Sequence, residues 1–103
     1  MDQNIKKNLA SNWFKTLQNV FCNDISKLEG NRVKFKSTNW KRNNQKDEGG
    51  GEYRILQNGK VFDKVGVNFS KVYGKFPKQF QKNILGAQKD PRFWASGISV
   101  VMH

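Results

Sequence analysis

Two β-prone runs flank the dipeptide Asn58-Gly59, and this pattern constrains the fold of the chain more than any other. Asn-Gly between alternating apolar residues is the strongest short signal for a β-hairpin, because both residues tolerate positive φ. A two-residue turn sets a register in which opposite charges face each other across the strands, which supports the pairing. The predicted strands are 52–57 and 60–69, with Gln57 opposite Lys60, Leu56 opposite Val61, Ile55 opposite Phe62 and Arg54 opposite Asp63.

Apolar residues recur at spacings of three, four and seven through residues 4–28. This pattern predicts one long amphipathic helix, which could break near Asn23–Asp24 and which Gly30 is placed to end. We expect the apolar stripe to pack against the core of the domain rather than to form a ligand site. The stripe consists of Ile5, Leu9, Trp13, Leu17, Val20, Phe21 and Leu28.

Alternating residues near both ends of the remaining sequence predict further strands at 32–36 and 96–102. In the second of these, Ile98, Val100 and Met102 share one face, whereas Ser99, Val101 and His103 share the other. A short helix is expected after Pro77, ending at Gly86. The sequence therefore predicts an α+β fold in which a long N-terminal helix packs on an antiparallel β-sheet.

The composition fits one small domain with a strongly basic surface. The 103 residues carry a formal net charge of +11, which attracts anions such as nucleic acid, acidic lipid or a polycarboxylate. A generally Lys- and Asn-rich composition explains the same charge without any specific site. Cys22 is the single cysteine, which fits a reducing compartment and a cytoplasmic location, and we expect it to be a small core residue. No apolar run is long enough for a membrane span.

Generic catalytic patterns are missing from the sequence. The single histidine rules out a Ser–His–Asp set within this chain, and no cluster of zinc type is present. The run Gly49-Gly50-Gly51 lies in a predicted polar loop, 41–52, and lacks the Lys-Ser/Thr ending of a phosphate-binding P-loop. Such a run is, by itself, typical of a flexible linker.

Four segments in order carry a more specific signal. They are Trp40-x-Arg42, the glycine run, the segment 59–74 beginning GKVFDKVGVNFS, and the segment 90–103, DPRFWASGISVVMH. Together they resemble the aerobic coproporphyrinogen III oxidase family from about Trp13 to the last residue. The resemblance implies that 1–103 is the N-terminal portion of a single domain, with a larger helix-flanked antiparallel sheet and a homodimeric assembly.

The family resemblance also implies the chemistry. Members oxidatively decarboxylate two propionates of coproporphyrinogen III, consuming molecular oxygen and yielding protoporphyrinogen IX, carbon dioxide and hydrogen peroxide. The resemblance implies no cofactor beyond oxygen, although a divalent metal is possible in the full-length family. By position, Ser99 matches a substrate-contacting serine and His103 matches a metal ligand. Residues 99 and 103 share one strand face about 13 Å apart, which is roughly the span of a tetrapyrrole.

The sequence departs from the family pattern in two places. The family shows four glycines soon after Trp-x-Arg, whereas here three follow Asn43–Glu48. The family also continues beyond the matched histidine into further histidines, arginines and a carboxylate. We therefore expect the 103-residue chain to be inactive alone and His103 to bind no metal in it. Candidate contacts to substrate propionates are Arg42, Arg54 and Lys64, with Arg54 potentially occupied by Asp63.

Two alternatives to catalysis remain at this point. A basic nucleic-acid-binding module would use the charge, with a sequence pI of about 10.1, and interleaved aromatics as stacking platforms. Scarce arginine and the core-facing positions of several aromatics argue against nucleic acid as the partner. The other alternative keeps the family but makes the chain a folded scaffold without catalysis.

Overall fold

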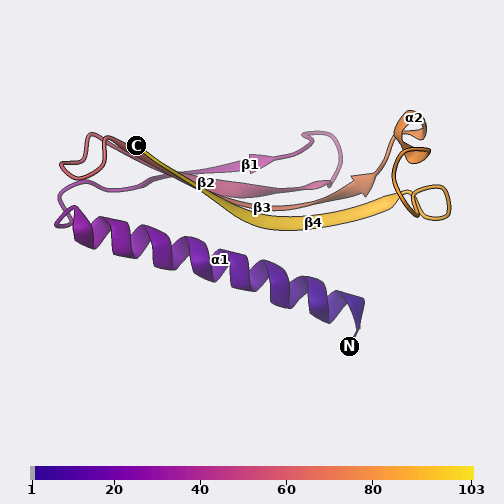
Figure 1. Ribbon diagram of the computed structural model, residues 1–103, viewed down its shortest axis with the longest axis horizontal. Helices are drawn as coiled ribbons and strands as arrows, with labels where there is room; N and C mark the ends of the chain where they lie inside the picture. Colours follow the sequence, from indigo (N-terminus) through magenta and orange to yellow (C-terminus); the bar gives the residue numbers. More distant parts are fainter. Residues whose placement is uncertain (1) are drawn as a thin grey trace.

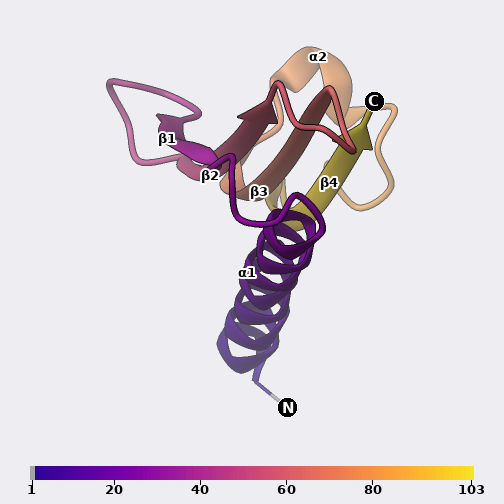
Figure 2. The same cartoon turned by 90° about the vertical axis from the view of Figure 1, so that its left-hand side faces the viewer.

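Four antiparallel strands form one sheet in the order β1-β2-β3-β4, and a long helix runs along one face of it (Figures 1 and 2). The structure is a computed structural model and describes residues 2–103. Each strand pairs with the next one in the sequence, so the sheet is a meander. The predicted α+β class is confirmed. The elements are α1 (Gln3–Leu28), β1 (Lys36–Lys41), β2 (Gly49–Gln57), β3 (Lys64–Lys75), α2 (Lys78–Gln81) and β4 (Arg92–Met102).

Helix α1 is continuous, and the break considered near Asn23–Asp24 does not occur. The Asp2 carboxylate accepts a hydrogen bond from the Asn4 N–H at 2.6 Å and caps the first turn. Gly30, at φ 69°, takes the left-handed conformation that ends the helix, as its position in the sequence predicted. In the chain from residue 2 onward, neither helix is long and apolar enough to cross a membrane.

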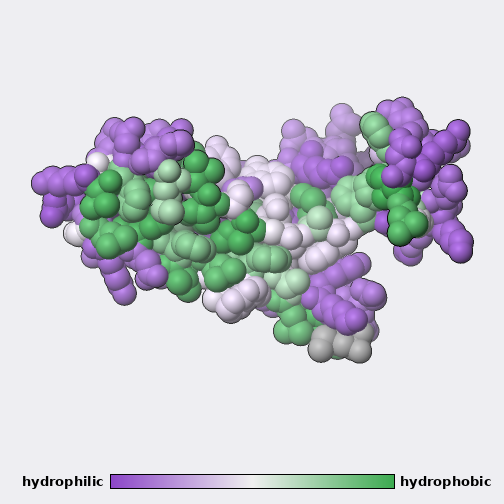
Figure 3. All heavy atoms as spheres, viewed as in Figure 1, coloured by the Kyte–Doolittle hydropathy of each residue, from purple (hydrophilic) through white to green (hydrophobic). Residues whose placement is uncertain are grey.

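The apolar stripe predicted on α1 does not face the sheet, so the expectation that it packs against the core was wrong. Trp13 is 60% exposed, and its neighbours along the stripe are similarly open to solvent. The sheet instead contacts a second stripe at spacings of seven, four and three, formed by Ser11, Gln18, Cys22 and Ile25. Figure 3 shows hydrophobic residues gathered over the C-terminal half of α1 and the adjoining end of the sheet. The exposed members are Ile5, Leu9, Trp13, Val20, Phe21 and Leu28.

Polar contacts explain this orientation of α1. The Gln18 side chain is fully buried, and its Nε2 donates to the carbonyl oxygens of Glu52 (2.8 Å) and Val67 (3.2 Å). A buried amide must be hydrogen-bonded, and these two strand carbonyls satisfy it. The periodicity of apolar residues carries no information about such a contact, so the helix was predicted with the wrong side inward.

The apolar core is small and lies under the C-terminal half of α1. Cys22 and Ile25 pack against Leu56, Val65 and Val67 of the two central strands. Cys22 is 5% exposed, which confirms the expectation of a core residue, and burial raises the pKa of its thiol. Partly buried side chains surround this cluster, namely Val33, Phe35, Phe62, Ile98 and Val100.

The connection between β2 and β3 differs from the predicted two-residue turn. Gln57 pairs with Lys64, so residues 58–63 form a longer loop and the predicted register was wrong by four residues. The Glu29 carboxylate, buried at the end of α1, fixes this loop. It accepts hydrogen bonds from three successive backbone N–H groups, at Lys60 (2.7 Å), Val61 (3.0 Å) and Phe62 (2.8 Å).

The other predicted elements are partly confirmed. The strand predicted at 32–36 begins only at Lys36, because Val33 and Phe35 instead pack beside the core. The predicted C-terminal strand is confirmed and begins earlier, at Arg92. The helix expected after Pro77 is the short α2, and Gly86 lies beyond it at φ 83°.

The Glu29 contacts predict that the loop depends on a charged acceptor. Hydrogen bonds from Phe62 and Val61 lower the pKa of the Glu29 carboxyl from its ordinary 4.5. The carboxylate therefore stabilises the fold at pH values above this ordinary pKa. Its contribution is lost as the pH falls through the lower pKa of the folded state. In Glu29→Gln we expect a lower melting temperature, faster amide exchange at residues 60–62 and a weaker loss of stability at acid pH.

The matched control is Asp24→Asn, which removes an exposed carboxylate from the same helix. We expect it to leave amide exchange at residues 60–62 unchanged. Equal exchange rates in the two variants would show that the loop does not depend on Glu29.

Candidate functional site

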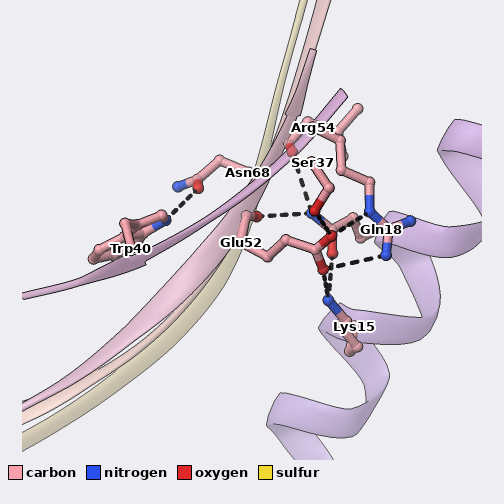
Figure 4. A network of polar contacts seen from close by, with 8 residues as sticks. Lys15, Gln18, Ser37, Trp40, Glu52, Arg54 and Asn68 are labelled. Carbon is pink, nitrogen blue, oxygen red and sulfur yellow. Dashed lines mark hydrogen bonds and ion pairs between the residues drawn. The ribbon is translucent and has the colours of Figure 1, made fainter. Parts of the chain in front are cut away.

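The face of the sheet that points away from α1 carries the predicted site residue Ser99. Strand pairing aligns Ser99 of β4 with Asn68 of β3, and Asn68 with Tyr53 of β2. The Trp40 indole, from β1, donates from Nε1 to Asn68 Oδ1 at 3.0 Å. Figure 4 shows this pair on the side of the strands opposite the helix. We call this surface the outer face; it also includes Gly51, Ser70, Val72, Ala95, Gly97 and Val101.

The middle of the outer face is uncharged, and most of its side chains are small. The cross-strand row beside Asn68 runs from Trp40 to Gly51, Ser70 and Gly97, so small residues occupy three of the four strands. The Trp40 ring lies over Gly51, where an added Cβ would come within 2.7 Å of it. Such a surface can make van der Waals contact with a flat apolar ligand. It also offers that ligand two polar partners, the Asn68 amide and the Ser99 hydroxyl.

His103 continues the same ladder at its end. Its backbone N–H donates to the Lys64 carbonyl oxygen at 2.9 Å, and its own carbonyl accepts from Asp63 at 2.8 Å. The alternation that begins at Ser99 therefore extends to His103, which is exposed. Among residues 2–103, no group of three or more His, Cys, Asp or Glu side chains could hold a metal ion. The residues present around His103 thus do not fit a metal site.

The two arginines considered as propionate contacts are engaged within the protein. Arg42 Nη1 donates to the Tyr73 carbonyl oxygen at 3.0 Å, and its guanidinium lies 4.6 Å from the centre of the Phe93 ring. Arg54 pairs with Glu52 through two hydrogen bonds of 2.9 and 3.2 Å. The expected pairing of Arg54 with Asp63 was wrong, because the longer loop moves Asp63 out of register. Lys64 is exposed at the edge of the outer face.

The glycine run lies within β2 and is not a flexible linker. Residues 49–51 pair with β1 on one side and with β3 on the other. A Cβ at Gly51 would lie 1.9 Å from the Phe69 carbonyl oxygen, so this position excludes any side chain. The predicted polar loop at 41–52 is therefore shorter, and the glycines allow close approach of backbone to a neighbouring strand.

A polar network joins α1 to the face of the sheet that lies opposite the outer face (Figure 4). The Glu52 carboxylate accepts hydrogen bonds from Arg54, Lys15 and Ser37. These contacts, the one from Arg54 first, lower the pKa of Glu52 from 4.5 to about 2 despite partial burial. The sequence held a weak signal for this network, since Glu52 and Arg54 alternate onto one strand face, but nothing indicated that Lys15 would reach it.

Comparison with known proteins identifies relatives of the chain. The coproporphyrinogen III oxidase family profile matches residues 9–103. The oxygen-dependent coproporphyrinogen-III oxidase of Rickettsia typhi is 43% identical over 105 residues, covering 94% of this chain and 36% of the relative. That of Rickettsia bellii is 41% identical over 108 residues, covering 95% of this chain and 37% of the relative. The chain thus spans about a third of the length of the curated relatives it matches.

The close approach at Gly51 predicts unequal effects of alanine on stability at two glycines of the outer face, Gly51 and Gly66. Gly51→Ala must displace either the Phe69 carbonyl or the Trp40 ring, and we expect a cost of roughly 1–3 kcal/mol in unfolding free energy. The matched control is Gly66→Ala, because no atom lies within 4 Å of a Cβ there. It should change stability by less than about 1 kcal/mol. Urea denaturation measures both, and equal effects would contradict the packing of Trp40 over Gly51.

Proposed function

The chain belongs to the coproporphyrinogen III oxidase family, and we propose that it forms the N-terminal part of an oxygen-dependent enzyme of haem biosynthesis. The observation that carries this proposal is the family match across residues 9–103. The substrate is coproporphyrinogen III. Each of two propionates loses carbon dioxide and two electrons to become a vinyl group, and each electron pair reduces one molecular oxygen to hydrogen peroxide with protons from the reaction. The product is protoporphyrinogen IX.

We assign the outer face to the tetrapyrrole. Its uncharged middle, between Trp40 on β1 and Ser99 on β4, suits a flat and largely apolar macrocycle. Ser99 is a substrate-contacting residue in this assignment, and its hydroxyl can donate to or accept from the ligand. The protein's contribution is to hold and orient the substrate and to exclude water, because the electron-rich tetrapyrrole itself reacts with oxygen.

The basic surface has a role in the same proposal. A net charge of +11 attracts a ligand that carries four carboxylates and raises its rate of encounter. Of the three cations first considered, Lys64 fits best as a direct contact, because it is exposed on the outer face beside His103. Arg42 and Arg54 instead bind groups of the protein. Arg42 fixes the loop after β1, and Arg54 fixes the Glu52 carboxylate.

The proposal extends to assembly and location. The chain supplies one part of the site, so we propose that it has no turnover alone. The remaining catalytic groups come from the part of the family's sequence that this chain does not cover. A homodimer is proposed for the complete enzyme. A cytoplasmic location is proposed from the single free cysteine, which fits a reducing compartment.

A chimera tests the function. The matched third of the Rickettsia typhi relative is replaced by this chain, and oxygen-dependent formation of protoporphyrinogen IX is measured with and without Ser99→Ala. We expect an active chimera and a several-fold higher KM for Ser99→Ala, because one hydrogen bond to bound substrate is lost. Thr16→Ala, which removes an exposed hydroxyl from α1, is the control and should leave KM unchanged.

A titration of the isotope-labelled chain with coproporphyrinogen III under anaerobic conditions locates the ligand. Amide shifts confined to Ser99, Asn68 and their neighbours on the outer face are expected. A folded chimera without activity would contradict the proposed function, and shifts confined to the helix side would contradict the assignment of the outer face.

A further inference from the structure

A cleft lies on the helix side of the sheet. Helix α1 covers β3 and β4 there and leaves β1 and the start of β2 uncovered (Figure 2). The volume of the cleft is about 400 Å³. Ser99 points to the other side of the strands, although Trp40 and Gly51 of the outer face also border this cleft. The lysines of the cleft lie on the helix side and are not part of the proposed tetrapyrrole site. The walls of the cleft include Lys15, Lys41, Lys71, Phe69 and Tyr73, with the glycine run as floor.

Strand register places two lysines on either side of a bare backbone position. Lys41 of β1 is opposite Gly50 of β2, and Gly50 is opposite Lys71 of β3, so the three residues form one row on one face. A Cβ at Gly50 would lie 2.1 Å from the Trp40 carbonyl oxygen, so no side chain can fill the space between the lysines. Two strand spacings separate the lysine backbones by about 10 Å, a gap that two lysine side chains can close around one ligand.

The charge of the cleft is incompletely neutralised. Within residues 2–103, neither Lys41 nor Lys71 forms an ion pair, whereas Lys15 is engaged by Glu52, which Arg54 also neutralises. One further carboxylate, Asp47, is near enough to Lys41 and Lys71 to feel their charge. The Tyr73 hydroxyl and the Gly49 N–H hold it, and together with the two lysines they lower the pKa of the Asp47 carboxyl. One fixed carboxylate therefore faces two free ammonium groups.

We propose that this cleft binds a small multivalent anion, with the ammonium groups of Lys41 and Lys71 as its ligands and Gly50 as the floor. Two ammonium groups from one row of the sheet carry up to six donors and two charges, which match a phosphate group or a pair of carboxylates. Phe69 and Tyr73 border the cleft and give it an apolar wall beside the two lysines. The shared chemistry of the ligand is multiple anionic oxygens.

The full chain is titrated separately with inorganic pyrophosphate and with citrate at low ionic strength, followed by calorimetry and amide NMR. We expect saturable binding of at least one probe, with shifts at Gly50, Lys41 and Lys71. Tighter binding of pyrophosphate would identify a phosphate ligand, and tighter binding of citrate a carboxylate ligand. Lys41→Gln with Lys71→Gln should weaken binding by roughly tenfold or more, because both direct ligands are lost.

The control is Lys82→Gln with Lys89→Gln, which removes the same charge from two exposed positions outside the cleft. We expect less than a twofold effect from this pair at equal ionic strength, because distant surface charges are largely screened. Equal loss in both double variants would mean a diffuse basic surface and would overturn the proposal. Absence of saturable binding for both probes would overturn it as well.

Discussion

The buried carboxylate of Glu29 and the partly buried carboxylate of Glu52 hold α1 against the sheet, and the rest of the structure depends on these two polar anchors. Glu29 ties the end of the helix to the loop between the central strands, and Glu52 receives Lys15 from the middle of the helix. The apolar core between them is small, with Cys22 and Ile25 as the helix's buried apolar contribution. A helix fixed in this way turns polar residues inward and leaves its larger apolar side chains in solvent.

The sequence predicted the type and order of the elements better than their contacts. Alternation located the C-terminal strand and the face on which Ser99 lies, because a period of two follows directly from strand geometry. The hairpin register could not be predicted from Asn58-Gly59 alone. Its loop is set by Glu29, which lies far away in the sequence and supplies the acceptor for three N–H groups. Tertiary contacts of this kind override local turn preference.

The candidate site was also predictable only in part. The motif around Ser99 carried the family resemblance, and strand alternation placed it on an exposed face. The row from Trp40 over Gly51 required the pairing of three strands, which no local pattern contains. The glycine run shows the same limitation, because a flexible linker and a strand whose neighbours exclude side chains have identical letters. The pairing of the run with β1 and β3 separates the two interpretations, as does the 1.9 Å that would lie between a Cβ at Gly51 and the Phe69 carbonyl oxygen.

The middle rows of the two faces of the sheet differ in charge. Period-two alternation sends Glu52, Arg54 and Lys71 to the helix side, and sends Tyr53, Asn68 and Ser99 to the outer side. Cations on the helix side still contribute to the field around a domain this thin, while the middle of the outer face, where we propose the ligand contact, is uncharged and Lys64 lies exposed at its edge. Such an arrangement attracts an anionic ligand at long range without burying an unpaired lysine beneath it, a burial that would cost several kcal/mol.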